Sequence, residues 1–241
     1  MKKKFGLIGK SLAHSFSPRY FVEKFEAEAL PYSYDALEFN RITDLSKEFI
    51  KQYNGLNVTI PYKSEIIPFC DELSPEAKAI GAVNTLHVHE GEIKGYNTDH
   101  IGFIRPLLSR INEIKTAVVL GTGGASKAVR YALELHGIQV RHVSRFPTST
   151  RMHYDSLTPA VLARFDLIVN TTPLGMYPNV KEVPSIPTYA FKDNQIVYDL
   201  IYNPAETKLL RIARDKGCTT INGSEMLTVQ AEESWTIWTK N

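Results

Sequence analysis

The sequence predicts an α/β protein of two domains, in which an N-terminal α/β domain precedes a doubly wound, Rossmann-like domain. Apolar strand segments alternate with helical segments over the first hundred residues, which is typical of a largely parallel sheet covered by helices. A glycine-rich turn between an apolar strand and a helix then opens a run of βαβ units, as in nucleotide-binding sheets. The 241 residues suffice for two such domains, since a domain commonly has roughly 100–200 residues.

Composition indicates a soluble, reduced protein without a strongly charged partner. Hydrophobic residues make up 43% of the chain, enough for a packed core, and the net charge of +2 gives no reason to expect nucleic acid as a partner. No apolar run approaches the roughly 20 residues of a membrane span, and the one near the N-terminus is too short for a signal peptide. Cys70 and Cys218 lie outside any metal-ligand spacing. We therefore expect a cytoplasmic protein with no metal site.

An amphipathic helix is predicted directly after a first strand at residues 4–9. The segment "SFSPRYFVEKFEAEAL" offers Ser17 as an N-cap and Pro18 as the first helical residue. Apolar residues then recur every four positions along one expected face, at Phe21, Phe25 and Ala29.

The rest of the first domain, which we place at residues 1–100, alternates in the same way. "YSYDALEF" and "GLNVTI" are predicted strands, and "TDLSKEFIKQYNG" between them is a predicted helix capped by Thr43 and followed by Gly55. "TLHVHEGEIKGYN" is typical of a hairpin turning at Glu90 and Gly91. The hairpin predicts an irregular or antiparallel edge of the sheet.

The second domain is placed at residues 101–222, and a helix from about Thr98 to Arg110 is expected to link it to the first domain. Its predicted strands are 115–120, 138–144, 166–170 and 196–200, and its main helices are 125–136 and 204–217. Pro204 lies near the start of the latter helix and Gly217 just past its end. A last helix, 224–238, belongs to a segment 223–241 that we expect to pack back on the first domain.

The strongest local signal is the turn in "KTAVVLGTGGASKAVRYALELHG". Glycines let the backbone turn tightly and approach a pyrophosphate, and the helix N-terminus behind them presents free N–H groups. Ser126 stands where the third glycine of a dinucleotide fingerprint would fall. The turn predicts dinucleotide binding by Gly121, Thr122, Gly123, Gly124 and Ala125; the alternative is a tight βα turn without a ligand.

The end of the next strand bears on the choice of cofactor. NAD-binding sheets carry an acidic residue about 20 positions after the glycines, where it binds a ribose hydroxyl. Here that place holds Ser144 and Arg145. A hydroxyl and a guanidinium suit a 2′-phosphate, so the sequence favours NADP, although Arg145 as an ordinary surface residue is the alternative.

Two charged residues of the first domain are candidates for proton chemistry. Lys63 follows the strand that Pro61 stops, and Asp99 stands beside Asn97 and Thr98 at the start of a helix. A lysine can protonate or stabilise an alkoxide if a partner holds it in place, which Asp99 would do. A surface lysine and a helix-capping aspartate are the alternatives.

Paired hydroxyls and paired imidazoles also occur at i, i+2 spacing. Ser15 and Ser17 precede a helix, where both hydroxyls are suited to bind one carboxylate. His87 and His89 share one face of a strand, but no third metal ligand accompanies them. We expect these histidines to be surface residues of the hairpin.

Eight motifs together resemble those of the shikimate dehydrogenase family, in order and over nearly the whole chain. They are "HSFSP", "NVTIPYK", "GAVNT", "GYNTDHIGF", "GTGGASKA", "NTTPLGM", "DLIYNPAETKLL" and "NGSEML…QA". The resemblance implies an enzyme that reduces 3-dehydroshikimate to shikimate with NADPH, in the pathway to chorismate and the aromatic amino acids. It also implies an N-terminal substrate domain, a C-terminal NADP-binding domain, and a monomer or homodimer with no nucleic-acid or membrane partner.

The resemblance assigns roles to individual residues. Lys63 and Asp99 match the family's catalytic pair and also contact the substrate. The other implied substrate-binding residues are Ser15, Ser17, Thr59, Asn84, Tyr202 and Gln230. The implied cofactor-binding residues are Gly121 to Ala125, Ser144, Arg145, Leu200 and Gly223.

One departure from the family leaves alternatives open. The usual Asn-Arg-Thr motif is here Ser144-Arg145-Phe146, so the arginine remains while a hydroxyl is lost. A quinate/shikimate dehydrogenase with looser cofactor choice is one alternative, and a non-catalytic nucleotide-sensing module is another. The presence of both Lys63 and Asp99 argues against the second.

Overall fold

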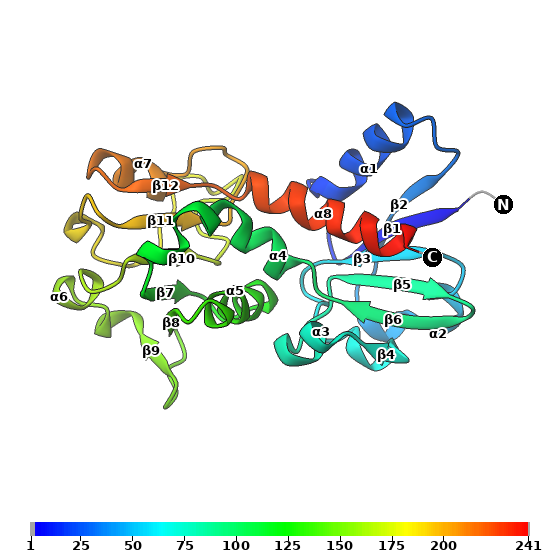
Figure 1. The fold of residues 1–241 in the computed structure, drawn as a ribbon, viewed down its shortest axis with the longest axis horizontal. Coiled ribbons are helices and arrows are strands. Elements are labelled where there is room, and N and C mark those ends of the chain that lie inside the picture. The colour runs from blue at the N-terminus through cyan, green and yellow to red at the C-terminus, as the bar shows by residue number, and fades with distance from the viewer. Residues whose placement is uncertain (1–2, 241) are drawn as a thin grey trace. The chain divides into compact units, whose positions relative to one another are not determined.

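The computed structural model describes residues 3–240 and divides them into two compact α/β units (Figure 1). One unit contains the described residues up to Asp99 together with those from Gln230 on, and the other is His100–Val229. Helix α8 (Ser224–Thr239) therefore begins in the second unit and ends in the first. Each unit contains one six-stranded sheet, which confirms the predicted α/β fold class.

The sheet of the first unit is mixed, with the strand order β2-β1-β3-β5-β6-β4. Strand β1 pairs in parallel with β2 and β3, whereas β5 is antiparallel to β3 and β6. The predicted hairpin is present, and Glu90 and Gly91 at its turn have φ of 52° and 80°, as tight hairpin turns require. It lies inside the sheet, because β4 adds a further edge. The strands are β1 (Lys4–Gly9), β2 (Ser33–Glu38), β3 (Gly55–Val58), β4 (Glu72–Leu73), β5 (Thr85–His89) and β6 (Glu92–Tyr96).

Helices cover both faces of this sheet. Helix α1 (Phe16–Ala27) and the second half of α8 pack on the face that receives Phe5 and Leu7, while α2 (Lys47–Ile50) and α3 (Pro75–Ile80) pack on the other. The contact with α8 is close, because a Cβ added at Gly55 would lie 2.2 Å from the Trp238 indole nitrogen. Only glycine fits there, which fixes α8 against β3.

Helix α1 begins earlier than predicted. Its N-cap is Ser15, not Ser17, and Pro18 is the third helical residue rather than the first. Starting at Phe16 places Ser17 on the buried face, one turn before Phe21. The expected apolar face also ends sooner: Ala29 is exposed and lies beyond the helix with φ of 52°.

The helix predicted over residues 43–55 is wrong in its extent. The chain forms a 3₁₀ turn at Ile42–Asp44 and then the single turn of α2, whose cap is Ser46 rather than Thr43. Extended backbone at Leu45 separates the two and buries that side chain in the core. Gly55 is the first residue of β3 instead of a helix terminator.

The sheet of the second unit is entirely parallel, with the order β12-β11-β10-β7-β8-β9. Counted from β7, this is the 3-2-1-4-5-6 order of doubly wound dinucleotide-binding sheets. The central pair β7 and β10 is the point at which the strand order reverses, where such sheets bind ligands. The strands are β7 (Thr116–Leu120), β8 (Gln139–Ser144), β9 (Arg151–His153), β10 (Leu167–Asn170), β11 (Ile196–Asp199) and β12 (Thr219–Ile221).

Alternating side chains of β7 supply two separate cores. Ala117 and Val119 face α4 (Asp99–Ile104), α5 (Gly124–Leu135) and the start of α8, while Val118 and Leu120 face α6 (Pro159–Leu162) and α7 (Lys208–Asp215). Such two-sided burial explains why the strands of this unit are continuous apolar runs.

Two helices of this unit differ from their predicted bounds. The helix expected to reach Arg110 ends at Ile104 and continues as 3₁₀ turns, because Pro106 has no N–H to donate. Helix α7 begins at Lys208 rather than near Pro204, since the Thr207 hydroxyl accepts the cap hydrogen bond from Leu210 N–H.

A buried carboxylate, Asp199, joins three segments at the carboxyl end of the second sheet. Its Oδ1 accepts hydrogen bonds from Asn170 Nδ2 (3.0 Å) and Ile201 N–H (3.2 Å), and its Oδ2 accepts one from the Thr207 hydroxyl (2.6 Å). Burial raises the pKa of Asp199 to about 6 despite these bonds, because desolvation disfavours the charged form.

Replacing Asp199 by asparagine should remove part of the pH dependence of stability. The folded pKa of about 6 exceeds the ordinary 3.8, so the contribution of Asp199 to stability is full below pH 3.8 and is lost as the pH rises through 6. That shift corresponds to about 3 kcal/mol. Relative to the unsubstituted protein, Asp199→Asn should therefore become more stable by about this amount between pH 4 and 7.

Urea unfolding at several pH values measures this difference directly. The exposed Asp215 gives a matched control, since Asp215→Asn should follow the unsubstituted protein throughout. Parallel stability curves for Asp199→Asn and the unsubstituted protein would contradict the assignment.

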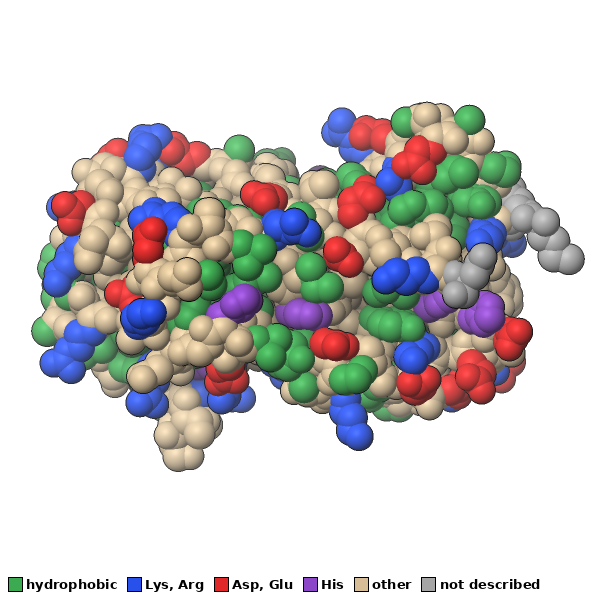
Figure 2. All heavy atoms as spheres, in the orientation of Figure 1, with side chains coloured by type: hydrophobic (Ala, Val, Ile, Leu, Met, Phe, Trp, Pro, Cys, Tyr) green, Lys and Arg blue, Asp and Glu red, His purple; other side chains and the backbone are tan. Residues whose placement is uncertain are grey.

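On the face in Figure 2, acidic and basic side chains are interspersed. Within residues 3–240, no helix combines the length and apolar character needed to cross a lipid bilayer.

Candidate active site

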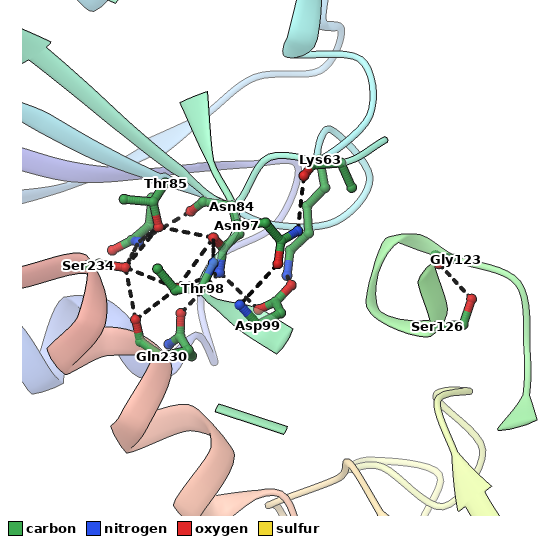
Figure 3. Close-up of polar contacts among 12 residues, drawn as sticks. Lys63, Asn84, Thr85, Asn97, Thr98, Asp99, Gly123, Ser126, Gln230 and Ser234 are labelled. Atoms are coloured by element: carbon green, nitrogen blue, oxygen red, sulfur yellow. Dashed lines mark hydrogen bonds and ion pairs between the residues drawn. The ribbon is translucent and has the colours of Figure 1, made fainter. Parts of the chain in front are cut away.

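Lys63 and Asp99 form a largely buried ion pair in the first unit. The Lys63 Nζ lies 2.6 Å from Asp99 Oδ2, and the two side chains are only 16% and 5% exposed (Figure 3). The backbone of Lys63 is also held, because its carbonyl accepts a hydrogen bond from Val83 N–H at 2.7 Å. Lys63 is therefore not an ordinary surface lysine.

The carboxylate of Asp99 is held by side-chain partners. At the start of α4 the Asn97 side chain accepts the hydrogen bond from Asp99 N–H (3.1 Å). Asn84 Nδ2 donates to Asp99 Oδ1 at 2.9 Å, while Lys63 occupies Oδ2. Each carboxylate oxygen thus has one fixed donor, and the ammonium keeps its remaining protons for another acceptor.

Gln230 of helix α8 also contacts the residues around Asp99. Its Oε1 lies 3.4 Å from Asn84 Nδ2, and its backbone carbonyl accepts a hydrogen bond from the Thr98 hydroxyl at 2.9 Å. Four of the predicted substrate-binding residues, Lys63, Asn84, Asp99 and Gln230, are therefore in one hydrogen-bonded cluster, as Figure 3 shows.

The other predicted substrate-binding residues of this unit lie outside that direct cluster. Ser15 caps α1 without a side-chain cap bond, and Thr59 follows β3 with its N–H bound to the Ile8 carbonyl (2.9 Å). Ser17 is 9% exposed and lies near the buried Tyr34, whose pKa desolvation raises well above its usual value. Tyr34 donates a hydrogen bond to Asn57 Oδ1 of β3 at 2.8 Å.

Several residues of this network were not singled out from the sequence as site residues. They are the buried polar side chains of Thr85, Asn97, Thr98 and Ser234. For Ser234 a signal was present, since it lies four residues after Gln230 and hence on the same helix face.

The glycine-rich turn of the second unit has the backbone that the sequence predicted. Gly121 directly follows β7 and has φ of 110°, and a Cβ added there would lie 2.6 Å from Thr171 Oγ1, whereas a Cβ on Gly123 would meet nothing within 4 Å. The space at Gly123 lies at the N-terminus of α5, which has no side-chain cap bond. Ser126 replaces the third glycine; it is 1% exposed, and its hydroxyl donates to the Gly123 carbonyl at 2.7 Å.

The residues predicted to select the cofactor lie at the end of the neighbouring strand β8. Ser144 is its last residue, is 6% exposed, and accepts a hydrogen bond from Phe146 N–H at 3.1 Å. Arg145 and Phe146 follow it and are exposed. The hydroxyl of Ser144 thus fixes the turn that carries the guanidinium.

The remaining predicted residues follow the last long strand. Leu200 N–H donates to the Asn170 carbonyl (3.0 Å), and Gly223 N–H to that of Ile201 (3.0 Å). A Cβ on Gly223 would lie 2.0 Å from the Leu200 carbonyl oxygen. Tyr202 is half-buried, and desolvation raises its pKa.

The second unit fits a dinucleotide phosphate by its own geometry. Open space above Gly123, the uncapped helix behind it and the left-handed Gly121 form an anion cradle at the carboxyl end of β7. Arg145 places a cation directly after strand β8, and the neighbouring positions Ser144 and Phe146 carry no acidic side chain. The donor set therefore suits NADP.

Known proteins resemble this chain over almost its full length. A family model described as the shikimate dehydrogenase substrate binding domain matches residues 7–86. A protein of Clostridium botulinum strain Hall, named shikimate dehydrogenase (NADP(+)), is 38% identical over 98% of this chain and 96% of its own.

Solved structures of shikimate dehydrogenases also resemble this chain. A chorismate mutase/shikimate 5-dehydrogenase fusion protein from Clostridium acetobutylicum has a TM-score of 0.89 at 37% identity, covering 99% of this chain and 92% of that one. The shikimate 5-dehydrogenase of Thermus thermophilus, solved in complex with NADP(H) and shikimate, has a TM-score of 0.86 at 32% identity, with 98% and 93% coverage. The similarity extends over both units.

Proposed function

The chain belongs to the shikimate dehydrogenase family, and from that premise we propose that it catalyses the reversible, NADPH-dependent reduction of 3-dehydroshikimate to shikimate. The observation that carries the proposal is the buried Lys63–Asp99 pair, which lies beside the amides of Asn84 and Gln230. Such a cluster of donors and acceptors matches a small ring that carries several hydroxyls. The same residues would serve the reaction in both directions.

Lys63 carries the proton chemistry in this proposal. Reduction of the C3 carbonyl builds negative charge on oxygen, and an ammonium can stabilise that charge and then supply the proton. The nicotinamide, when bound, supplies the hydride. Asp99 keeps Lys63 oriented through its 2.6 Å contact and offers its carboxylate to a neighbouring ring hydroxyl.

Recognition of the ring is assigned to the polar groups around this pair. We propose that Asn84, Gln230 and Thr59 bind the ring hydroxyls and that Ser15 and Ser17 bind the carboxylate. Tyr202 is proposed to face the same substrate. A buried polar group without a partner costs roughly 1–3 kcal/mol, so a substrate that lacks one of these hydroxyls should bind less well.

NADP is assigned to the second unit. We propose that Gly121 to Ala125 hold the pyrophosphate, that Ser144 and Arg145 face the 2′-phosphate, and that Leu200 and Gly223 lie beside the nicotinamide. Supporting this are the open space at Gly123 and the absence of an acidic side chain at Ser144 or Arg145. A carboxylate there would repel a 2′-phosphate.

Gly123→Ala should weaken cofactor binding without weakening the fold. The added methyl meets no protein atom within 4 Å, so the melting temperature should stay unchanged. It would occupy the space assigned to the pyrophosphate, and the Kd for NADP should rise on the order of tenfold, or about 1.4 kcal/mol. Calorimetric titration measures the Kd; unchanged affinity for NADP would contradict the assigned cradle.

An absorbance assay at the nicotinamide band tests the function itself. Shikimate and quinate are each offered with NADP and with NAD. The proposal predicts the highest kcat/KM with shikimate and NADP. Preference for quinate with NAD would favour a quinate/shikimate dehydrogenase with looser cofactor choice. No turnover with any of the four substrate–cofactor pairs would favour a nucleotide-sensing module.

We further propose that the protein is located in the cytoplasm and acts as a monomer or homodimer. Cys70 and Cys218 are both free, as is usual in a reducing compartment. Burial raises the pKa of Cys70 to about 12, which keeps it an unreactive thiol.

A further inference from the structure

Ser234 is a buried hydroxyl at the meeting point of four segments. It is 0% exposed and lies one helical turn after Gln230 on α8, to whose carbonyl it donates at 2.9 Å. Its Oγ also accepts from Asn57 Nδ2 of β3 at 3.0 Å, and it lies 2.8 Å from Thr85 Oγ1 of β5 and 3.3 Å from Thr98 Oγ1 (Figure 3). One side chain thus connects α8 with two strands and with the segment that leads into α4.

Two of the partners of Ser234, Thr85 and Thr98, are also the residues that orient the Asn84 amide. Thr98 N–H donates to Asn84 Oδ1 at 2.7 Å, and the Thr85 hydroxyl donates to the same oxygen at 3.0 Å. With its oxygen held in this way, the amide directs Nδ2 toward Asp99 Oδ1 (2.9 Å) and Gln230 Oε1 (3.4 Å). A reversed amide would place its oxygen against those acceptors, so the orientation matters to the whole cluster.

We infer that Ser234 is a positioning residue of the substrate site. By its close contacts with the Thr85 and Thr98 hydroxyls it holds both of them beside the amide of Asn84, and through its bond to the Gln230 carbonyl it fixes the helix turn that presents Gln230. The inference rests on the proposed function, since it concerns how the same site recognises a ring with several hydroxyls. Ser234 itself touches no substrate in this account.

The alternative is that Ser234 is only a helix serine satisfying the carbonyl four residues before it. Three other hydroxyls of α8 do this: Thr228 donates to the Ser224 carbonyl (3.4 Å), Thr236 to that of Glu232 (3.0 Å) and Thr239 to that of Trp235 (2.8 Å). None of the three has a hydrogen bond to a neighbouring strand among those found in the described part of the chain. Thr239, which is exposed, is therefore a matched control.

The test compares steady-state kinetics of Ser234→Ala and Thr239→Ala. Loss of the hydroxyl removes the nearest acceptor of Asn57 Nδ2 and the contacts that hold the Thr85 and Thr98 hydroxyls, and we expect KM for shikimate to rise about 5- to 10-fold. The KM for NADP should stay within about twofold and kcat should fall less than KM rises, because the change concerns ring recognition. Thr239→Ala should match the unsubstituted protein, and shikimate binding by calorimetry should show the same 5- to 10-fold loss for Ser234→Ala.

A double-mutant cycle with Asn84→Ala separates positioning from stability. If Ser234 acts through Asn84, Ser234→Ala should change KM less than about twofold in the Asn84→Ala background. Equal effects in both backgrounds, or a lower melting temperature with unchanged KM, would overturn the inference. Should Ser234→Ala not fold, Ser234→Cys keeps the volume with a weak hydrogen-bonding group, and the same rise in KM is expected.

Failure of the proposed function would be seen separately. The unsubstituted protein must first bind shikimate and reduce NADP with it. If it does neither, the proposed function and the inference about Ser234 are both wrong. If it does both and the double-mutant cycle is additive, only the positioning role of Ser234 is wrong.

Discussion

Lys63→Ala should lower kcat by at least about 100-fold, in line with the usual contribution of a positioned acid or base. The substitution removes the ammonium that lies 2.6 Å from Asp99 and that would stabilise the alkoxide. Most of the groups proposed to bind the ring remain in place, so KM for shikimate should change much less than kcat. Steady-state kinetics with saturating NADP separates the two effects.

A surface lysine with a similar ion pair provides the control. Lys94 lies 2.7 Å from Glu72 in the same unit, but the two side chains are 37% and 61% exposed, and such pairs contribute little. Lys94→Ala should retain full turnover, and circular dichroism should show that both variants are folded. A folded Lys63→Ala protein with near-normal kcat would defeat the catalytic assignment.

Gly223→Ala should be strongly destabilising. The added Cβ would lie 2.0 Å from the Leu200 carbonyl oxygen and 2.6 Å from its carbonyl carbon, and backbone at the end of a buried strand cannot move cheaply. Forced overpacking of this kind should cost about 3 kcal/mol. For a chain of this size, that corresponds to a loss of roughly 6–12 °C in melting temperature.

The same variant should also impair the cofactor site, since Leu200 and Gly223 are the residues assigned beside the nicotinamide. Thermal unfolding of Gly223→Ala and Gly123→Ala gives a clear contrast, because both gain one methyl but only the first meets protein atoms. Equal melting temperatures for the two variants would show that the close approach of Gly223 to Leu200 is not rigid.

Elements with a strong pattern or a specific turn residue were predictable from sequence. The apolar runs of β7 and β10, the hairpin turn at Glu90 and Gly91, and the tight glycine turn between β7 and α5 appear as expected. Short strands were missed, because β4, β9 and β12 have two or three residues each and depend on pairing with a neighbour. A segment of that length has no measurable periodicity.

Helix starts were less predictable where several capping residues compete. Ser15 and Ser17 are equally good caps by type, and burial of Ser17 beside Tyr34 decides between them. Long-range side-chain contacts were the hardest to predict. The sequence left Lys63 and Asp99 open between a surface lysine, a helix cap and a working pair, since their 2.6 Å contact spans 36 residues of chain.

The most direct test of the account follows one hydrogen atom. Shikimate deuterated at C3 is oxidised with NADP, and the reduced cofactor is isolated and analysed by mass spectrometry and NMR. The account predicts deuterium at C4 of the nicotinamide, with transfer at a normal rate only when Lys63 is present. Reduced cofactor without deuterium, or no reduced cofactor at all, would contradict hydride transfer between this substrate and NADP.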